Sequence, residues 1–106
     1  MHRILYSERT DIGAVVHTHS TYATTLSCLH EGLLPVHYLI GFAGHDVRCT
    51  EYAPFGSPEL ARLAFEGMRD RYAVLLSNHA AEEVPHGGVV ALPTGAEGAV
   101  DRKSVV

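Results

Sequence analysis

Two histidines placed two residues apart are the feature of this sequence most able to do chemistry. His17 and His19 lie in the stretch DIGAVVHTH, whose β-branched and apolar residues predict a strand. Side chains at positions i and i+2 of a strand project from one face, with Cα atoms about 7 Å apart. Two imidazoles held in this way can bind one metal ion. The pair alone is a weak indication, because two polar residues at a strand end have the same spacing.

A catalytic zinc ion uses three protein ligands and leaves a position for water or substrate. The best candidate for the third ligand is His79, which ends the apolar run YAVLLSNH. A short run of this kind predicts a strand that is covered on both faces. Two parallel or neighbouring strands that end together would bring His79 to the histidine pair. His86, in the segment PHGGVVAL, is the alternative third ligand.

The residues after the histidine pair predict a helix of about three turns. Ser20 can serve as its N-cap, and Gly32 can supply a left-handed stop. The apolar residues between them recur at helical spacing: Tyr22, Leu26 and Leu29. A helix therefore follows directly on the strand that carries the pair.

The segment SPELARLAFEGM is the most secure helix of the sequence. Ser57 is a good N-cap, Pro58 suits the first helical position, and one apolar stripe follows. Further strands are expected in LLPVHYLIG, where Pro35 favours an edge position or a strand start, and between Asp46 and Tyr52. Strands and helices alternate, which is typical of an α/β fold.

Length and charge exclude several classes of protein. The 106 residues suffice for one domain, and the formal net charge of −4 gives no basic face for nucleic acid. No stretch approaches the roughly 20 apolar residues of a membrane span, and the opening residues lack the apolar core of a signal peptide. We therefore expect neither a nucleic-acid nor a membrane partner, and a cytoplasmic location.

The sequence changes character at Ala80. Residues 80–106 are rich in glycine, proline and small side chains, with VVAL as the one strand candidate. We expect a core at residues 1–79 and a loosely ordered tail at 80–106. The run YAVLLSN would then lack cover on one side and promote association with other chains.

The stretch from Asp11 to His79 resembles the central part of class II aldolases of the aldolase/adducin superfamily, of the fuculose-phosphate aldolase type. The matching elements are the His-Thr-His pair, the Pro-x-His-Tyr segment, the Tyr-x-x-Phe-Gly turn before a capped helix, and the Leu-Leu-x-x-His strand. They occur in the family's order and at its spacings. The resemblance implies part of a three-layer α/β/α sandwich on a mainly antiparallel sheet, truncated at both ends, and assembly into homotetramers.

The resemblance also implies a set of roles. His17, His19 and His79 would hold a divalent metal ion, usually zinc. The metal would bind a ketose phosphate such as fuculose 1-phosphate and stabilise the enediolate formed when the carbon–carbon bond breaks, giving dihydroxyacetone phosphate and an aldehyde. Tyr38 corresponds to a tyrosine near the family's active site and would assist the departing aldehyde. A core tyrosine with a satisfied hydroxyl is an equally good interpretation of Tyr38.

Departures from the family pattern point to an incomplete enzyme. The family's proton-transferring glutamate and its phosphate-binding loops would precede Met1, and the glycine that follows the third histidine is replaced by Ala80. We therefore expect no activity from this chain alone. Two alternatives share the pattern: a non-catalytic adducin-like interaction domain, and a sugar-phosphate epimerase or dehydratase of the same superfamily.

Other candidate residues have plainer interpretations. His30, near the end of the first helix, is expected to face solvent and to favour the helix dipole. His37 alternates with Tyr38 along the expected strand, which favours packing or a subunit contact on the opposite face. Glu51 and Asp46 could replace the missing base, but nothing in the spacing places them at the metal.

Overall fold

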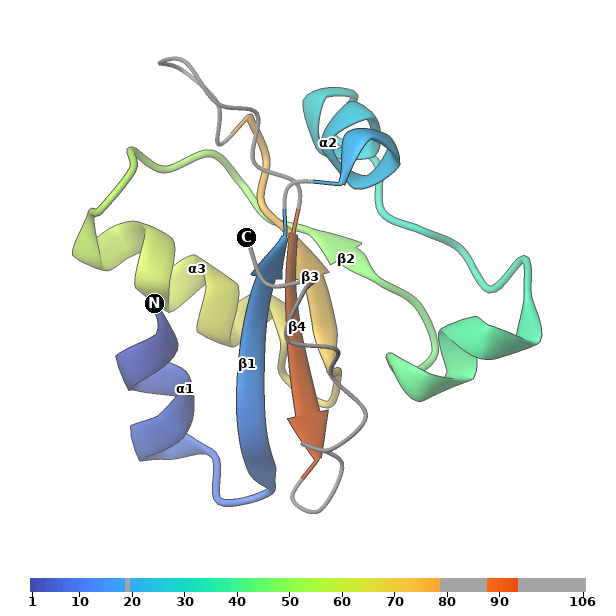
Figure 1. Cartoon of the computed structure of the whole chain (residues 1–106). Helices are drawn as coiled ribbons and strands as arrows, with labels where there is room; N and C mark the ends of the chain where they lie inside the picture. Colours follow the sequence, from blue (N-terminus) through green and yellow to red (C-terminus); the bar gives the residue numbers. More distant parts are fainter. Residues whose placement is uncertain (19, 79–87, 94–106) are drawn as a thin grey trace.

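The computed structural model describes residues 1–18, 20–78 and 88–93, which form one four-stranded sheet flanked by helices (Figure 1). The strands are β1 (Ile12–Thr18), β2 (Arg48–Cys49), β3 (Ala73–Leu75) and β4 (Gly88–Pro93), in the spatial order β1-β4-β3-β2. β4 is antiparallel to both β1 and β3, whereas β2 is parallel to β3. Consequently β1, β2 and β3 all run in the same direction.

Helices cover both faces of the sheet. The helical segments are α1 (His2–Glu8), α2 (Thr21–Cys28), the 3-10 helix η1 (Tyr38–Phe42) and α3 (Pro58–Gly67). On one face, α1 and α3 enclose a core that includes Leu5, Met68 and Val74. On the other face, Leu26 of α2 packs against a second cluster that includes Leu75. The alternation of Val74 and Leu75 between the two clusters follows from the period of a strand.

The prediction of a helix in SPELARLAFEGM is confirmed by α3. Ser57 is its N-cap, and its Oγ accepts a hydrogen bond from the backbone N–H of Leu60 over 3.1 Å. The buried residues Leu60 and Ala64 form the expected apolar stripe towards the core. Gly67 is the last residue of the helix and lies close to Val74: a Cβ at Gly67 would lie 2.6 Å from Val74 Cγ2.

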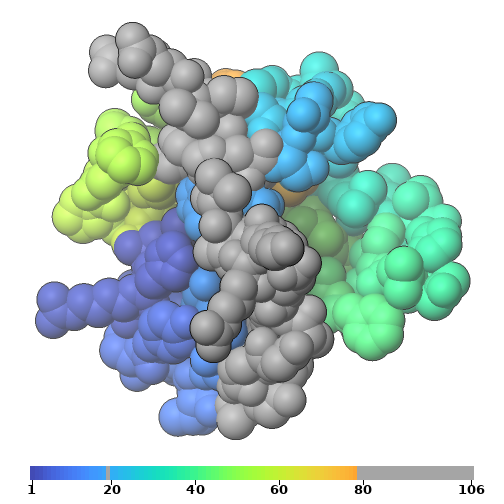
Figure 2. All heavy atoms as spheres, in the orientation of Figure 1, coloured from blue at the N-terminus to red at the C-terminus, as the bar shows by residue number. Residues whose placement is uncertain are grey.

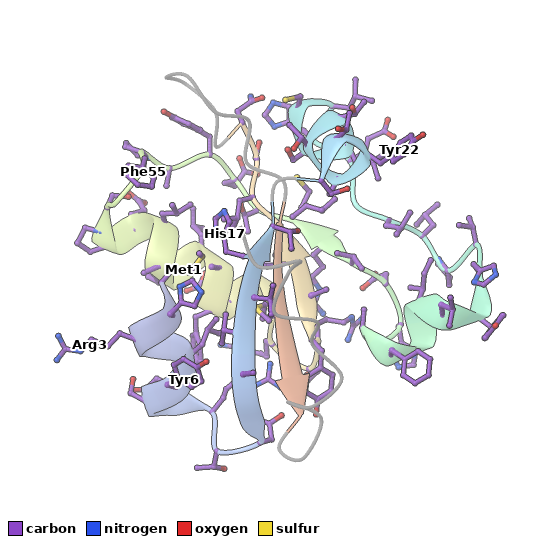
Figure 3. The ribbon with its side chains drawn as sticks, viewed as in Figure 1. Met1, Arg3, Tyr6, His17, Tyr22 and Phe55 are labelled. Carbon is purple, nitrogen blue, oxygen red and sulfur yellow. The ribbon has the colours of Figure 1, made fainter. Side chains whose placement is uncertain are left out.

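The helix after the histidine pair is shorter than the sequence predicts. It ends at Cys28, and the residue with the left-handed conformation is His30, with φ of 56°, rather than Gly32. Gly32 serves a close approach instead, because a Cβ there would lie 2.6 Å from the carbonyl oxygen of Val47. The expected apolar stripe is also wrong in part, since Tyr22 is 86% exposed and points away from the sheet (Figure 3).

The prediction of a strand in LLPVHYLIG is wrong. Only Leu33 pairs, in an isolated antiparallel bridge with Val47, and the chain then turns into η1. Pro35 has no N–H to extend a ladder, and His37 caps η1 by accepting the N–H of Leu39 at Nδ1 over 3.2 Å. The strand expected between Asp46 and Tyr52 is present as the short β2.

The expectation that the run YAVLLSN lacks cover on one side is wrong. β3 lies between β2 and β4, and Val74 and Leu76 are essentially inaccessible to solvent. Both residues are buried in the cluster formed with α1 and α3, and the strand predicted in VVAL is β4, which pairs along one edge of β3. The other residues of 80–106 lie outside the described part, so the division at residue 79 stays a prediction.

The α/β class predicted from the sequence is therefore observed, while the complete three-layer sandwich of an intact protein stays a prediction. Among the residues that the structure describes, no helix has the length and apolar character needed to cross a membrane.

Candidate functional site

The carboxyl ends of β1 and β3 lie at the same level of the sheet. Gly88 of β4 pairs with Thr18 on one side and with Leu75 on the other. Because neighbouring strands are about 4.8 Å apart, the backbones of Thr18 and Leu75 are separated by about 10 Å. These two strand ends lead into the histidines singled out in the sequence. A metal ion shared by the two segments requires this kind of arrangement.

His17 is the second-to-last residue of β1 and pairs with Val89 of β4. The residue is half-buried, and its Nε2 atom is buried. Val15, two residues earlier on the same face, packs against the core formed with α1 and α3. His17 therefore faces the α3 side of the sheet at the end of β1, as Figure 3 shows.

The other proposed ligands, His19, His79 and the alternative His86, lie outside the described residues. Within residues 1–18, 20–78 and 88–93, histidines, cysteines and acidic residues form no group of three that could hold a metal ion. The predicted ligand set is thus neither contradicted nor tested. What the structure contributes is the placement of the two strand ends and of the half-buried His17.

A histidine that the sequence did not assign to the site joins the turn after β3. His30 lies 2.7 Å from Ser77 Oγ through Nδ1 and 2.8 Å from Asn78 Nδ2 through Nε2. Ser77 is fully buried, and its N–H also donates to Thr50 Oγ1 over 3.3 Å. His30 is exposed, as expected, but its ring also contacts this turn. No sequence pattern joins residues so far apart in the chain.

Tyr38 lies away from His17 within this chain. It begins η1, on the β2 side of the sheet, whereas His17 lies at the end of β1 (Figure 1). The side chain is 80% exposed, so the interpretation of Tyr38 as a core tyrosine is wrong. The rings of His37 and Tyr38 contact each other with centroids 4.5 Å apart, so the two residues do not point to opposite faces as a strand would require.

The acidic residues considered as substitute bases have other environments. Asp46 accepts a hydrogen bond from Arg71 Nε over 2.8 Å, and this contact lowers the pKa of the carboxyl. Glu51 is exposed just beyond β2. In the described part of the chain, neither residue belongs to a group of three histidines, cysteines or acidic residues that could hold a metal ion. The structure therefore gives no support for either as a base.

A second cluster of charges lies at the opposite end of β1. Arg9 donates to both carboxylate oxygens of Asp11 and, through Nη1, to the carbonyl oxygens of Met68 and Arg71. Tyr72 donates to Asp11 over 3.1 Å. The hydrogen bonds from Arg9 lower the pKa of Asp11 to about 2. This cluster joins the start of β1 to the end of α3 and is structural.

Taken together, a mixed sheet with helices on both faces and a histidine at the common end of two parallel strands defines an α/β protein with a candidate metal centre. Residues 1–82 match the family model described as the Class II Aldolase and Adducin N-terminal domain, and the chain belongs to this family. Within the family it is similar to the fuculose-phosphate aldolases, as the following relatives indicate.

The relatives that it resembles are aldolases of sugar phosphates. The 5-deoxy-D-ribulose 1-phosphate aldolase of Bacillus thuringiensis serovar kurstaki is 58% identical over 79 residues, which cover 74% of this chain and 37% of the relative. The L-fuculose phosphate aldolase of Escherichia coli K12 is 37% identical over 79 residues, which again cover 74% of this chain and 37% of the relative. A solved L-fuculose 1-phosphate aldolase superposes with a TM-score of 0.76 and 48% identity, covering 85% of this chain and 39% of that one. The chain thus spans little more than a third of the length of these relatives.

Proposed function

We propose that this chain is the metal-binding part of a class II aldolase that cleaves a ketose 1-phosphate into dihydroxyacetone phosphate and an aldehyde. The observation that carries the proposal is the common level of the ends of β1 and β3, which Gly88 joins by pairing with both Thr18 and Leu75. His17 supports it as a half-buried imidazole at one of these ends. The family implies a divalent metal ion, and zinc suits a set of three imidazoles.

The chain's own residues would have two tasks in this reaction. His17, His19 and His79 would hold the metal, which supplies Lewis-acid stabilisation of the charge that develops on the substrate oxygens. β1 would hold His17, and a strand positions a ligand more rigidly than a free loop does, while His79 follows the end of β3 by four residues in the sequence. We propose that the proton is moved by a further group, because in the described part of the chain Asp46 is engaged by Arg71 and Glu51 is exposed beyond β2. We therefore expect no turnover from the chain alone.

The substrate class follows from the relatives. Those described above are named for 5-deoxyribulose 1-phosphate and fuculose 1-phosphate, which are both ketose 1-phosphates. The higher identity, 58%, is to the 5-deoxy-D-ribulose 1-phosphate aldolase. We propose 5-deoxyribulose 1-phosphate as the first substrate to test and fuculose 1-phosphate as the second.

Tyr38 could act only across a subunit contact, because the chain does not bring it to its own His17. The segment from Leu34 to Phe42 exposes Leu34, Val36, Tyr38, Leu39 and Phe42, each more than half accessible. It forms a protruding flank of the molecule (Figure 2). Contiguous exposed apolar side chains mark association surfaces. We propose that this segment contacts a second copy in a homo-oligomer and carries Tyr38 towards that copy's metal centre.

The experiment that tests the function uses a chimaera. Residues 11–78 of this chain replace the matching segment of the Bacillus thuringiensis relative, and aldehyde release from 5-deoxyribulose 1-phosphate is measured. We expect an active chimaera that His17→Ala impairs at least about 100-fold, because losing the metal would remove Lewis-acid stabilisation worth several kcal/mol and each 1.36 kcal/mol is tenfold in rate. His45→Ala, at an exposed residue beyond η1, is the matched control and should leave the rate unchanged.

The same chimaera distinguishes the aldolase proposal from a second candidate function. The exposed segment from Leu34 to Phe42 also fits a non-catalytic, adducin-like interaction domain. A folded chimaera that binds metal but releases no aldehyde would contradict the aldolase proposal and favour that candidate. An epimerase or dehydratase would instead convert its sugar phosphate without aldehyde release.

A further inference from the structure

His30 contacts the turn after β3 through both nitrogens of its ring. Asn78 Nδ2 lies 2.8 Å from Nε2, and an amide nitrogen can only donate, so Nε2 is the acceptor. Nδ1 then carries the ring proton and donates to Ser77 Oγ over 2.7 Å. A single side chain thus fixes two consecutive residues of the turn. The contact joins segments that lie 47 and 48 positions apart in the chain.

Both ends of this contact have a left-handed backbone. The φ angle is 56° at His30 and 42° at Asn78. A side chain with a Cβ adopts this region at an energetic cost, and asparagine bears it better than histidine does. Such conformations persist where the surrounding contacts determine them, and they gather at functional sites. At His30 the left-handed backbone belongs to a Schellman cap of α2, in which the N–H of Glu31 donates to the carbonyl of Leu26 over 3.1 Å and the N–H of His30 donates to that of Ser27 over 3.2 Å. The two hydrogen bonds of the imidazole add side-chain contacts to this cap.

The helix α2 connects this contact to the histidine pair. It starts at Thr21, two residues after His19, and His30 follows its last residue by two positions. The helix packs against β3 and β4, and Ser27 within it is fully buried. Figure 1 shows α2 at the end of the sheet where β1 stops. One short packed helix therefore spans the distance from the end of β1 to the turn after β3.

We propose that His30 is a positioning residue for the metal centre. His30 holds Ser77 and Asn78 in place, and His79 is the next residue in the sequence. The contact would therefore fix where the chain leads into His79, relative to the strand that carries His17. This inference rests on the proposed function, since it assumes that His79 is a ligand. It assigns His30 no contact with the metal or with substrate.

The test compares metal binding by the 106-residue chain and three variants. Cobalt(II) is titrated as a zinc substitute, because its visible absorption bands report the ligand geometry, and zinc affinity is obtained by competition. His30→Gly keeps the left-handed backbone but removes both hydrogen bonds, so we expect about tenfold weaker binding and shifted cobalt bands. His30→Asn keeps a side chain that tolerates the conformation and can hydrogen-bond, so it should recover part of the affinity. His45→Ala should match the parent.

Each outcome decides between positioning and plain stabilisation. Unchanged affinity and unchanged cobalt bands in His30→Gly would overturn the proposal, even if the melting temperature falls. Weaker binding with shifted bands, partly restored in His30→Asn, supports it. A parent chain that binds no metal would instead contradict the proposed metal centre and remove the basis of this inference with it.

Discussion

Thr18 of β1 and Leu75 of β3 pair with the same residue, Gly88 of β4, from its two sides. Two segments that are far apart in the chain thereby reach one end of the sheet together. The relationship depends on β4, a strand from the C-terminal part of the chain, which lies between β1, which carries His17, and β3, which precedes His79 in the sequence. The candidate metal centre is therefore a property of the sheet's topology rather than of any local motif.

The contact between α3 and β3 predicts the effect of a single methyl group. Gly67→Ala would place its Cβ 2.6 Å from Val74 Cγ2 and 3.3 Å from Thr50 Cγ2, and Val74 is buried. We expect the free energy of unfolding to fall by about 1 to 3 kcal/mol, as overpacking of a core does. Urea denaturation measures this.

Gly41→Ala is the matched control for that variant, because nothing lies within 4 Å of a Cβ at this position. Its free energy of unfolding should stay within about 0.5 kcal/mol of the parent. Equal stability of the Gly67 and Gly41 variants would show that α3 does not pack on β3 as closely as described.

The ion pair of Arg9 and Asp11 predicts a pH dependence of stability. Its hydrogen bonds lower the pKa of Asp11 from 3.8 to about 2, so the unfolded chain binds this proton more readily. The carboxylate therefore contributes stability above about pH 4, and this contribution is lost as the pH falls to about 2. Asp11 is 47% exposed, so screening limits it to about 0.5 to 1 kcal/mol.

Asp11→Asn should therefore destabilise the chain at pH 7 and cease to do so near pH 2. Urea unfolding at several pH values measures the difference between parent and variant. Glu59→Gln is the control, because Glu59 lies 3.6 Å from Arg62 on an exposed helix surface. A constant difference between Asp11→Asn and the parent across this pH range would rule out the ion pair as its origin.

The exposed segment around η1 predicts association between copies. Val36 and Phe42 are each 77% exposed, and their replacement in Val36→Thr and Phe42→Ser should lower the average mass in sedimentation equilibrium. The helical content should stay the same, because neither side chain belongs to the buried clusters. An average mass that these substitutions leave unchanged would place the association surface elsewhere.

Local sequence signals predicted the elements in which propensity and packing agree. Ser57, Pro58 and the apolar stripe of α3 each favour the same helix, and the β-branched residues before His17 favour β1. The segment around Pro35 misled the prediction, because its alternating apolar residues resemble a strand although they are exposed. Alternation alone does not indicate whether a partner strand is present to supply the hydrogen bonds.

The candidate site was predicted from the sequence only as far as its residue types. His17 and the histidine pair stand out because their spacing matches the period of a strand. The contacts of His30 with Ser77 and Asn78 join distant segments, and no local pattern encodes them. The exposure of Tyr38 was likewise hidden, because a tyrosine beside apolar residues suits a core and an association surface equally well.

The most direct test of the proposed centre is a zinc titration of the chain by competition with a chromophoric chelator. We expect one zinc ion per chain in the parent and in His45→Ala, and loss of that site in His17→Ala and His19→Ala. Loss in His79→Ala, with retention in His86→Ala, would identify the third ligand. Zinc binding by His17→Ala that equals the parent in stoichiometry and affinity would contradict a metal centre at the ends of β1 and β3.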